Sequence, residues 1–501
     1  MKANLTVHVP ESSRSRREPQ TAHLRRSAAT LLAGGLLLSC AACVTIPDDR
    51  NLLPQQDVAR AQLATDIKLA REGWPQAQWW TRYNDPQLNR LVAQALQNGP
   101  TLQIAAARVS EARAALQHDT SDKGPNVGLN ATTSRTLYSA EGFFPPPIGG
   151  SYYTETTVEA VAQYDFDWWG KHKAAIAAAL GEVNARRADY AQAEQTLAAA
   201  IAQSYFNLQG ARTRLVNLQD MLTLQRTMLA DNEKRIANGV ANNDGEHLAQ
   251  VGVAMLEQQI AQREAYIASE REALRALLGA DNHALADIAV QPLPQALPAL
   301  PSNLGIELLA RRPDLQAARW RVEASLDQID SAKAAFYPDI NLSAYFGSDV
   351  LSLDKLFNAA ARTMSIAPTL TLPLFDSGRL KASLEAVRSQ RNEMIADYNQ
   401  SVFNAVREVA QAGIGLQAVQ RQIDRQADAE TAAAAFLHST EARFKHGLTN
   451  RNTMLVAELA VREEQDTGLQ LKNQLLLADV ALIKALGGGY QAVQADAAPK
   501  Q

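Results

Sequence analysis

The sequence predicts an α+β membrane protein made of two similar halves, each with a pair of strands followed by long helices. Three observations predict this class. The chain repeats itself at an offset near 208 residues, long Ala- and Gln-rich stretches carry heptads, and four short segments alternate apolar with polar residues. Aromatic residues make up only 6% of the 501 residues, which favours long helices over an all-β fold.

Composition excludes several classes of protein. The chain carries 49 Lys and Arg against 53 Asp and Glu, a net charge of -4, so nothing attracts it generally to nucleic acid. Two cysteines are too few for a disulfide framework or a four-cysteine zinc cluster. Beyond the N-terminus no apolar run approaches the ~20 residues of a membrane-spanning helix.

The first 39 residues are expected to be a lipoprotein signal peptide. Arginines precede a short apolar stretch, 28–38, as in secretory signals. Leu37 to Cys40 resembles a lipobox, where a bacterial lipoprotein is cut and its new N-terminal cysteine is acylated. Cys43 is the alternative attachment site, and an ordinary signal peptide with two incidental cysteines is a third interpretation. Removal of six basic and two acidic residues with this segment changes the net charge from -4 to -8.

The remaining chain is one unit written twice. Four stretches recur in the same order at offsets of 208 to 213 residues: 101–109 and 314–322, 167–171 and 375–379, 235–240 and 443–448, 277–279 and 485–487. The expected division is an N-terminal extended segment at 40–85, a first repeat at 86–291, a Pro-rich linker at 292–301, a second repeat at 302–489 and a C-terminal tail at 490–501.

Each repeat has the same expected order of elements. A helical segment, 87–117 or 314–335, ends near a proline and leads into two extended segments. Two very long helical stretches follow and are broken once, at Gly239 or Gly447. Their heptads predict coiled-coil packing. The heptad positions are Leu208, Leu215, Leu222 and Leu229 in the first half, and Ile395, Val402, Val409, Leu416 and Ile423 in the second.

The extended segments have the period of transmembrane β-strands. They lie near 127–138, 153–166, 339–347 and 364–374. Alternation over about ten residues suits a strand with one face toward lipid and the other toward an aqueous lumen. A half-buried sheet in a soluble domain is the alternative. Four strands do not enclose a barrel by themselves, which indicates assembly.

Specific motifs resemble those of the TolC-like outer membrane efflux proteins, in their NodT/OprM-like lipoprotein branch. The resemblance covers nearly all of the mature chain. It rests on five motifs, at 43–48, 79–88, 334–340, 373–379 and 407–410. The first looks like the family's mature start and favours Cys43 over Cys40 as the lipidated residue. The sequence departs from the family at Asp49, where an aromatic residue is common, and at Gly413 and Gly415, which are expected to interrupt the long helix.

The resemblance implies a trimer in which each protomer gives four strands to one 12-stranded β-barrel, continued by a long periplasmic α-helical barrel. It implies that Gly170 and Gly378 are strand-to-helix hinges, which suits glycine's backbone freedom. Gly239 and Gly447 are expected to be equatorial helix breaks.

The function implied is an outer membrane channel subunit of a tripartite efflux pump that passively conducts small toxic compounds. The expected partners are two further copies of the chain, a periplasmic membrane-fusion adaptor, an inner-membrane pump of the RND type and outer membrane lipid. The outer membrane duct of a type I protein-secretion system is the alternative, and a structural periplasmic lipoprotein without a pore is a third class. Apart from the covalent lipid, no motif indicates a cofactor, a metal or enzymatic chemistry.

A periplasmic gate is expected at the tips of the helical hairpins. Counting back from Gly447 predicts the second tip near 417–427, with Arg421, Asp424 and Arg425. The corresponding stretch of the first half holds Arg212, Arg214 and Asp220. Salt bridges between hairpins would hold the closed state, whereas a solvated helix flank is the alternative for each residue.

Overall fold

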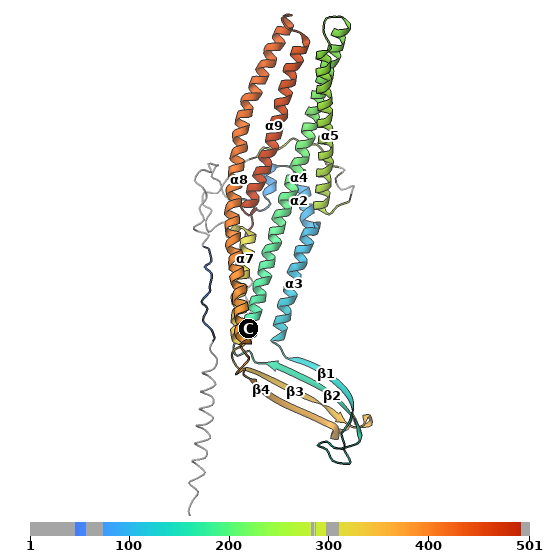
Figure 1. Ribbon diagram of the computed structural model, residues 1–501, viewed down its shortest axis with the longest axis vertical. Helices are drawn as coiled ribbons and strands as arrows, with labels where there is room; N and C mark the ends of the chain where they lie inside the picture. The colour runs from blue at the N-terminus through green and yellow to red at the C-terminus, as the bar shows by residue number, and fades with distance from the viewer. Residues whose placement is uncertain (1–45, 57–73, 282–284, 286, 297–309, 492–501) are drawn as a thin grey trace, which may run out of the picture. The chain divides into compact units, whose positions relative to one another are not determined.

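The structure is a computed structural model that describes residues 46–56, 74–281, 285, 287–296 and 310–491 (Figure 1). The predicted signal peptide, with Cys40 and Cys43, lies outside these residues. None of the helices in the described part of the chain is both long and apolar enough to cross a membrane.

The chain forms two compact units that cut across the two sequence repeats. A strand unit contains Val127–Trp169 and Ala332–Glu385, and a helix unit contains the described residues of 51–126, 170–331 and 386–491. Each repeat therefore contributes to both units. The repeats are interleaved in space, although they follow one another in the sequence.

The strand unit is a four-stranded sheet in the order β1-β2-β3-β4. All four predicted strands are confirmed, and their bounds are β1 Asn126–Leu137, β2 Tyr152–Asp165, β3 Asp339–Val350 and β4 Arg362–Thr371. The two central strands come from different repeats and pair antiparallel without a bulge, from Thr156 opposite Val350 to Asp165 opposite Asn341. Pro368 lies in β4, an edge strand, where its missing N–H is tolerated.

The duplication is visible in the helix lengths. The helices α4 (Lys171–Ala237) and α8 (Arg379–Lys445) both have 67 residues, and α5 (Asp244–Leu278) and α9 (Arg451–Ala485) both have 35. A 67-residue helix is about 100 Å long. The shorter helices α3 (Pro100–Asp122) and α7 (Pro313–Ala334) precede the strand pairs.

The predicted single helix at 87–117 is wrong, because two helices occupy this stretch. The first, α2 (Pro86–Asn98), ends where Gly99 turns to extended backbone, and α3 starts at Pro100. Proline lacks the N–H that would continue the first helix and is favoured at the first position of the second.

Gly239 and Gly447 lie in the turns of two helical hairpins, so their prediction as equatorial breaks is wrong. The helices on either side run antiparallel. Asn232 donates to the carbonyl of Gly245 at 2.9 Å across the first turn, and Gln426 donates to the carbonyl of Glu464 at 2.9 Å in the second hairpin. In Figure 1, α4 lies beside α5 and α8 beside α9. Both glycines have φ near +70°, a backbone conformation that residues with a side chain rarely adopt.

The expected interruption at Gly413 and Gly415 is also wrong, because α8 is continuous through both residues. A single glycine weakens a helix by roughly 0.5–1 kcal/mol relative to alanine. The contacts of the surrounding turns outweigh that cost. Val409 and Leu416 are completely buried on either side of the pair.

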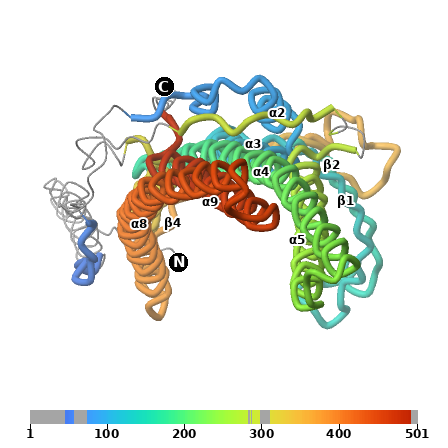
Figure 2. Tube along the Cα trace, turned by 90° about the horizontal axis from the view of Figure 1, so that it is seen from above, coloured from blue at the N-terminus to red at the C-terminus, as the bar shows by residue number. Residues whose placement is uncertain are grey.

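Two apolar cores hold the helix unit together. One joins α2, α4, α5 and α9 around Tyr205, Phe206 and Leu208, and the other joins α7, α8 and α9 around Tyr398 and Val402. The heptad positions Ile395, Val402, Val409 and Leu416 are buried, as predicted. Figure 2 shows α9 lying against α4, which joins the two hairpins of one chain.

The motif at 79–88 is a buried structural anchor. Trp79, Trp80 and Tyr83 form a 3-10 helix, η2 (Trp79–Tyr83), whose aromatic rings are buried. Asp85 caps α2 by accepting from the N–H groups of Gln87 and Leu88, and it also accepts the Tyr205 hydroxyl at 2.6 Å. The family motif therefore ties the N-terminal segment to α4.

Tyr83 connects the same segment to the second repeat. Its hydroxyl donates to Asp479 of α9 at 2.7 Å. Burial raises the pKa of Asp479, so the buried carboxyl depends on this donor and on the nearby charge of Arg82. The contact links residues that are 396 positions apart in the chain.

The glycine run at 487–489 ends α9 in a crowded place. Gly487 has φ +91°, and a Cβ there would overlap the backbone carbonyl of Arg311. Gly488 donates its N–H to the carbonyl of Ile483 at 2.9 Å, as in a helix C-cap. The run is therefore a helix end with close backbone contacts, and this close approach explains why the three positions carry no side chain.

We expect Gly487→Ala to lower stability by about 1–3 kcal/mol, because it combines a backbone clash with a positive φ. Gly415→Ala is the matched control. Its Cβ would meet open space inside α8, so we expect it to be neutral or to raise stability by about 0.5–1 kcal/mol. Thermal unfolding followed by helical circular dichroism measures both. Equal effects of the two substitutions would contradict this interpretation of the glycine run.

Candidate channel-forming site

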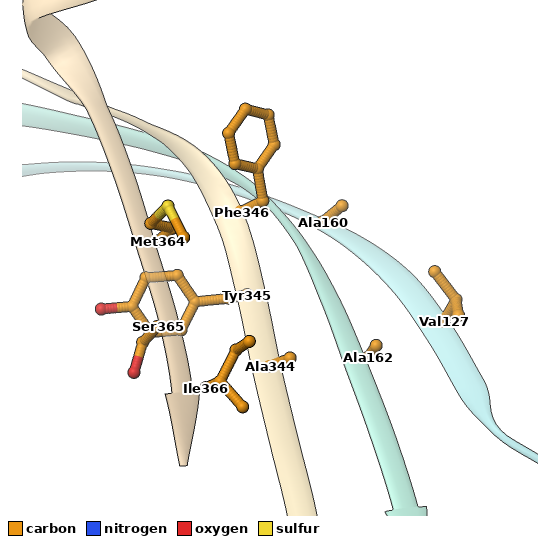
Figure 3. Close-up of a pocket in the computed structure, with 9 residues that line it drawn as sticks. All are labelled: Val127, Ala160, Ala162, Ala344, Tyr345, Phe346, Met364, Ser365 and Ile366. Atoms are coloured by element: carbon orange, nitrogen blue, oxygen red, sulfur yellow. The ribbon is translucent and has the colours of Figure 1, made fainter.

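One face of the sheet is apolar from edge to edge. The register aligns Ala160 with Phe346 and Met364 in one row, and Ala162 with Ala344 and Ile366 in the next. Figure 3 shows these side chains with Val127, around a shallow cleft on the sheet. Met364 and Ile366 are 72% and 70% exposed. We call this surface the apolar sheet face. Such a contiguous exposed apolar surface marks contact with lipid or another protein.

The opposite face carries the polar residues of the same strands, and we call it the polar sheet face. Here Gln163 lies opposite Ser343, and Asp165 lies opposite Asn341, which lies opposite Thr369. Strand pairing therefore collects the alternation predicted for each strand into two continuous surfaces. This is the arrangement of a transmembrane sheet with lipid on one side and water on the other.

Aromatic rings cluster at both ends of the strands. Near the β1–β2 loop, Tyr138 packs edge-on against Phe144 and Tyr153. At the ends that lead to the helices, Tyr164, Phe166 and Trp168 form a second group. Aromatic groups at the two ends of an apolar strand region suit the two interfaces of a bilayer.

Gly170 and Gly378 lie between strand and helix, as predicted. They have φ +73° and +90°, and a Cβ at either would meet nothing within 4 Å, so the backbone conformation alone requires glycine. Asp376 caps the second passage. Its carboxylate accepts from the N–H groups of Leu380 at 2.8 Å and Gly378 at 3.0 Å, and these hydrogen bonds lower its pKa.

The passages of the two repeats meet within the strand unit. Trp169, just before α4, stacks on Tyr337 with ring centroids 4.7 Å apart, and its indole N–H donates to the carbonyl of Pro338 at 2.8 Å. The recurring motif at 167–171 and the motif at 334–340, which are far apart in the sequence, therefore contact each other. The sequence contained both motifs but no signal of their contact.

The motif at 407–410 has a structural partner. Glu408 accepts from Arg312 at 2.8 Å, and Arg312 also binds Asp314 and donates to the carbonyl of Ala485 at 2.8 Å. The Arg312 side chain is only 5% exposed. This buried guanidinium joins α7, α8 and the end of α9, and removing one of its carboxylates would leave it partly unpaired.

The predicted gate residues of the second half do not lie at a hairpin tip, so that placement is wrong. Arg421, Asp424 and Arg425 are inside α8, about 33–39 Å before the turn at Gly447. Asp424 accepts from Gln420, and Arg425 pairs with Asp428 at 3.1 Å, both within the same helix. Gly447 is itself the hairpin turn between α8 and α9, so the tip lies at this residue and not before it.

The predicted gate residues of the first half have partners outside their own helix. Arg212 donates to the carbonyl of Ile288 at 2.8 Å, and burial lowers its pKa. Arg214 binds Asp466 with two nitrogens, at 3.0 and 2.5 Å, and Asp220 pairs with Arg462 at 3.2 Å. The last two are salt bridges between the two hairpins, but all three residues lie inside α4, about 28–40 Å before the turn at Gly239, so their placement at a hairpin tip is also wrong.

These salt bridges belong to a longer polar seam between α4 and α9. It lies beside an apolar cluster of Leu218, Met221, Leu222 and Leu256, against which Leu459 of α9 also packs. Apart from Arg214 and Asp220, its members were not predicted, because no sequence pattern paired α4 with α9. We define the α4–α9 seam by the contacts Asn207–Asn473, Arg214–Asp466, Asn217–Arg462, Asp220–Arg462 and Asp231–Arg451.

One group within the described residues has the composition of a metal site. His118, Asp119 and Asp122 lie at the end of α3 with their ligand atoms within 4.8 Å of one another. The His118 ring lies 3.4 Å from Asp119 and 3.6 Å from Asp122, and its side chain is 73% exposed. Contacts within one exposed helix turn account for the group.

Fold and surface together define a membrane channel protein with a long helical extension, and comparisons with known proteins identify the family. The family model described as "Outer membrane efflux protein" matches residues 91–280 and 304–488. The chain therefore belongs to the outer membrane efflux protein family.

Two curated relatives match over nearly their whole length. The multidrug resistance outer membrane protein MdtP of Escherichia coli (strain K12) is 40% identical over 460 residues, which cover 90% of this chain and 94% of that protein. The putative multidrug resistance outer membrane protein MdtQ of Shigella flexneri is 37% identical over 468 residues, 91% of this chain and 97% of that protein.

Solved structures agree with the fold. The outer membrane protein VceC of Vibrio cholerae is 32% identical with a TM-score of 0.75, over 83% of this chain and 100% of that chain. The CmeC outer membrane channel of Campylobacter jejuni is 20% identical with a TM-score of 0.80, over 90% and 95%, and supports the fold alone. The chain has the fold of the trimeric TolC-like channels, and it is an outer membrane efflux protein with a long periplasmic helical part.

We expect Ile366→Lys to prevent assembly in the outer membrane, because a cation on the lipid side of a strand costs about 2–4 kcal/mol at mid-membrane. Thr369→Lys, three residues further along β4 on the polar sheet face, should assemble normally. Outer membrane fractionation and the trimer band on unheated gels measure both variants. Normal assembly of Ile366→Lys would show that the apolar sheet face does not contact lipid.

Proposed function

We propose that the chain is the outer membrane channel subunit of a tripartite efflux pump and passively conducts small toxic compounds. The observation that carries the proposal is the division of the sheet into an apolar and a polar face, continued by duplicated helical hairpins. The names of MdtP and MdtQ, both multidrug resistance proteins, favour small compounds over secreted proteins as cargo. The proposed role involves no catalysis and needs no cofactor besides the lipid on Cys40 or Cys43.

The direct test is conduction. Purified full-length protein in planar bilayers should give discrete channel currents, and a deletion strain should become hypersensitive to several toxic compounds. Channel formation without hypersensitivity, together with loss of a secreted protein, would favour the protein-secretion alternative. Absence of currents under all conditions would contradict the channel.

The proposed partners are a periplasmic adaptor and an inner-membrane pump of the RND type. The hairpin turns offer an adaptor a matching pair of contacts. Val240 and Leu448 follow the two turn glycines at equivalent positions of the repeats and are 65% and 74% exposed. An apolar side chain at each turn suits helix-to-helix docking. A trimer would present six such turns.

We expect the double variant Val240→Asp and Leu448→Asp to form trimers but to leave cells as drug-sensitive as the deletion strain. A carboxylate at the centre of an apolar contact loses its hydration without gaining a partner. Leu353→Asp, in the β3–β4 loop with 65% exposure, is the matched control and should restore resistance. Drug susceptibility and cross-linking to the adaptor measure the effect. Full drug resistance of cells that carry the double variant would show that the turns are not part of the surface that binds the adaptor.

We propose that the α4–α9 seam helps to hold the channel closed. Exposed ion pairs are each worth about 0.2–1 kcal/mol, so several weak contacts form a lock that a partner can open. The two pairs nearest the turns, Asp220–Arg462 and Asp231–Arg451, have distances of 3.2 and 3.4 Å. Both join hairpins of different repeats, whose relative movement would change the tip.

We expect the double variant Arg451→Ala and Arg462→Ala to raise conductance in planar bilayers, because both inter-hairpin pairs are lost. Arg425→Ala removes a cation that pairs only within α8, and it should leave conductance unchanged. The same conductance in the double variant and the wild type would reject the seam as a lock. An increase in conductance in Arg425→Ala alone would indicate that the gate lies in the middle of α8.

A further inference from the structure

The charged residues of the four strands are sorted by sign between the two sheet faces. Five carboxylates lie on the polar sheet face, and no basic residue of the strands shares it. They are Glu155, Glu159, Asp165, Asp339 and Asp349. The only basic residues within the strands are Arg135 and Arg362, and both lie on the apolar sheet face.

Side-chain contacts establish the face of Arg135. The hydroxyl of Thr133 lies 3.1 Å from that of Thr156, so these two side chains share a face. Arg135 is two residues beyond Thr133 and therefore points to the same side. Its guanidinium stands 5.3 Å from the ring centre of Tyr152, four residues before Thr156. Both contacts put Arg135 on the face of Ala160 and Phe346.

The register establishes the face of Arg362. It is the first residue of β4 and lies opposite Ser348, two residues from Met364 and four from Ile366. In this part of β4 the even-numbered residues are exposed, and Thr363 and Ser365 between them are half-buried. Arg362 is therefore an exposed cation at the margin of an apolar surface.

Both arginines are close to the loop ends of their strands. Arg135 is two residues before the end of β1, and Arg362 begins β4 after the loop at 351–361. A cation on a lipid-facing strand is costly at the membrane centre and nearly free at the interface. Because the helices are periplasmic, the loop ends face the exterior and the outer leaflet. Neither arginine forms an ion pair within the described part of the chain.

We propose that Arg135 and Arg362 bind the phosphate groups of phosphorylated lipid in the outer leaflet. A guanidinium offers paired N–H donors that match phosphate oxygens, and it tolerates a partly apolar setting better than an ammonium does. The Tyr152 ring supports Arg135 and limits the positions that it samples. The apolar rows beneath the arginines accept the acyl chains.

The two arginines occupy the opposite edge strands of the sheet, so one site draws on two protomers. When the sheet closes in the trimer, β4 of one copy is followed by β1 of the next. Arg362 of one copy and Arg135 of the neighbouring copy then flank the same junction, which predicts three lipid sites for each trimer. This step rests on the membrane-embedded trimer.

Lipid binding to the purified full-length trimer tests the proposal. Native mass spectrometry would count bisphosphorylated lipid A bound during a titration, with dephosphorylated lipid A as a second ligand and inorganic phosphate as a competitor. We expect up to three tightly bound lipids for the wild type. The double variant Arg135→Gln and Arg362→Gln should bind about tenfold more weakly, since each cation near a lipid surface contributes appreciably.

Two control variants and two control ligands make the result decisive. Arg135→Lys with Arg362→Lys should retain most binding, and Lys355→Gln, which removes one positive charge in the β3–β4 loop, should bind as the wild type does. Equal binding by the double Gln variant, equal binding of dephosphorylated lipid, or an equal loss in Lys355→Gln would overturn the proposal. Competition by inorganic phosphate at equal concentration would indicate a free-anion site and reject the lipid.

The trimer band on unheated gels shows whether each variant has folded. Conductance in planar bilayers separates this inference from the proposed function. The double Gln variant should conduct as the wild type does, because its substitutions face away from the polar sheet face. A wild type that binds lipid A without conducting would contradict the channel and leave the lipid site standing.

Discussion

The rest of the structure depends on one constraint, the need to satisfy the backbone hydrogen bonds of four strands that face lipid. A bilayer offers no partner to an unpaired N–H or carbonyl, so the edges β1 and β4 must be covered by protein. Closure among three copies meets this need, which is why the family forms trimers. The protomer is therefore an incomplete membrane protein whose apolar and polar sheet faces have meaning only in the assembly.

The duplication is expressed in an interleaved way. Each repeat contributes two strands to one sheet and one hairpin to one helix unit, and the contacts between repeats are specific. Trp169 against Tyr337 joins the two repeats, and Tyr83 with Asp479 joins the N-terminal segment to the second repeat. Arg312 with Glu408 joins distant parts of the second repeat. The α4–α9 seam adds ion pairs between the hairpins. Together with the apolar core that α9 shares with α4, these ion pairs hold the hairpins of the two repeats together.

Sequence reasoning succeeded where a single element carries its own pattern. The strands showed their period of two, and the heptad positions from Ile395 to Leu416 marked a buried stripe that the structure confirms. It failed where helix limits decided the answer. Gly447 looks the same in a sequence whether it breaks one helix or joins two, so the tip was placed inside α8. At Gly413 and Gly415 the opposite holds. Packing on both sides keeps α8 continuous through two residues of low helix propensity.

By itself, the sequence determined the four strands, the long helical stretches, the duplication and the membership in a membrane channel family, because periodicity and local motifs are encoded by neighbouring residues. Only the tertiary structure decided which elements meet. The strand register combines the alternating apolar and polar residues of four strands into two continuous faces. It also places the acidic residues of the strands on one face and the basic residues on the other. Antiparallel packing of α4 on α9 placed Arg214 and Asp220, which were predicted at a hairpin tip, in inter-hairpin salt bridges inside α4. Such pairings depend on contacts between residues hundreds of positions apart, for which one sequence carries no local signal.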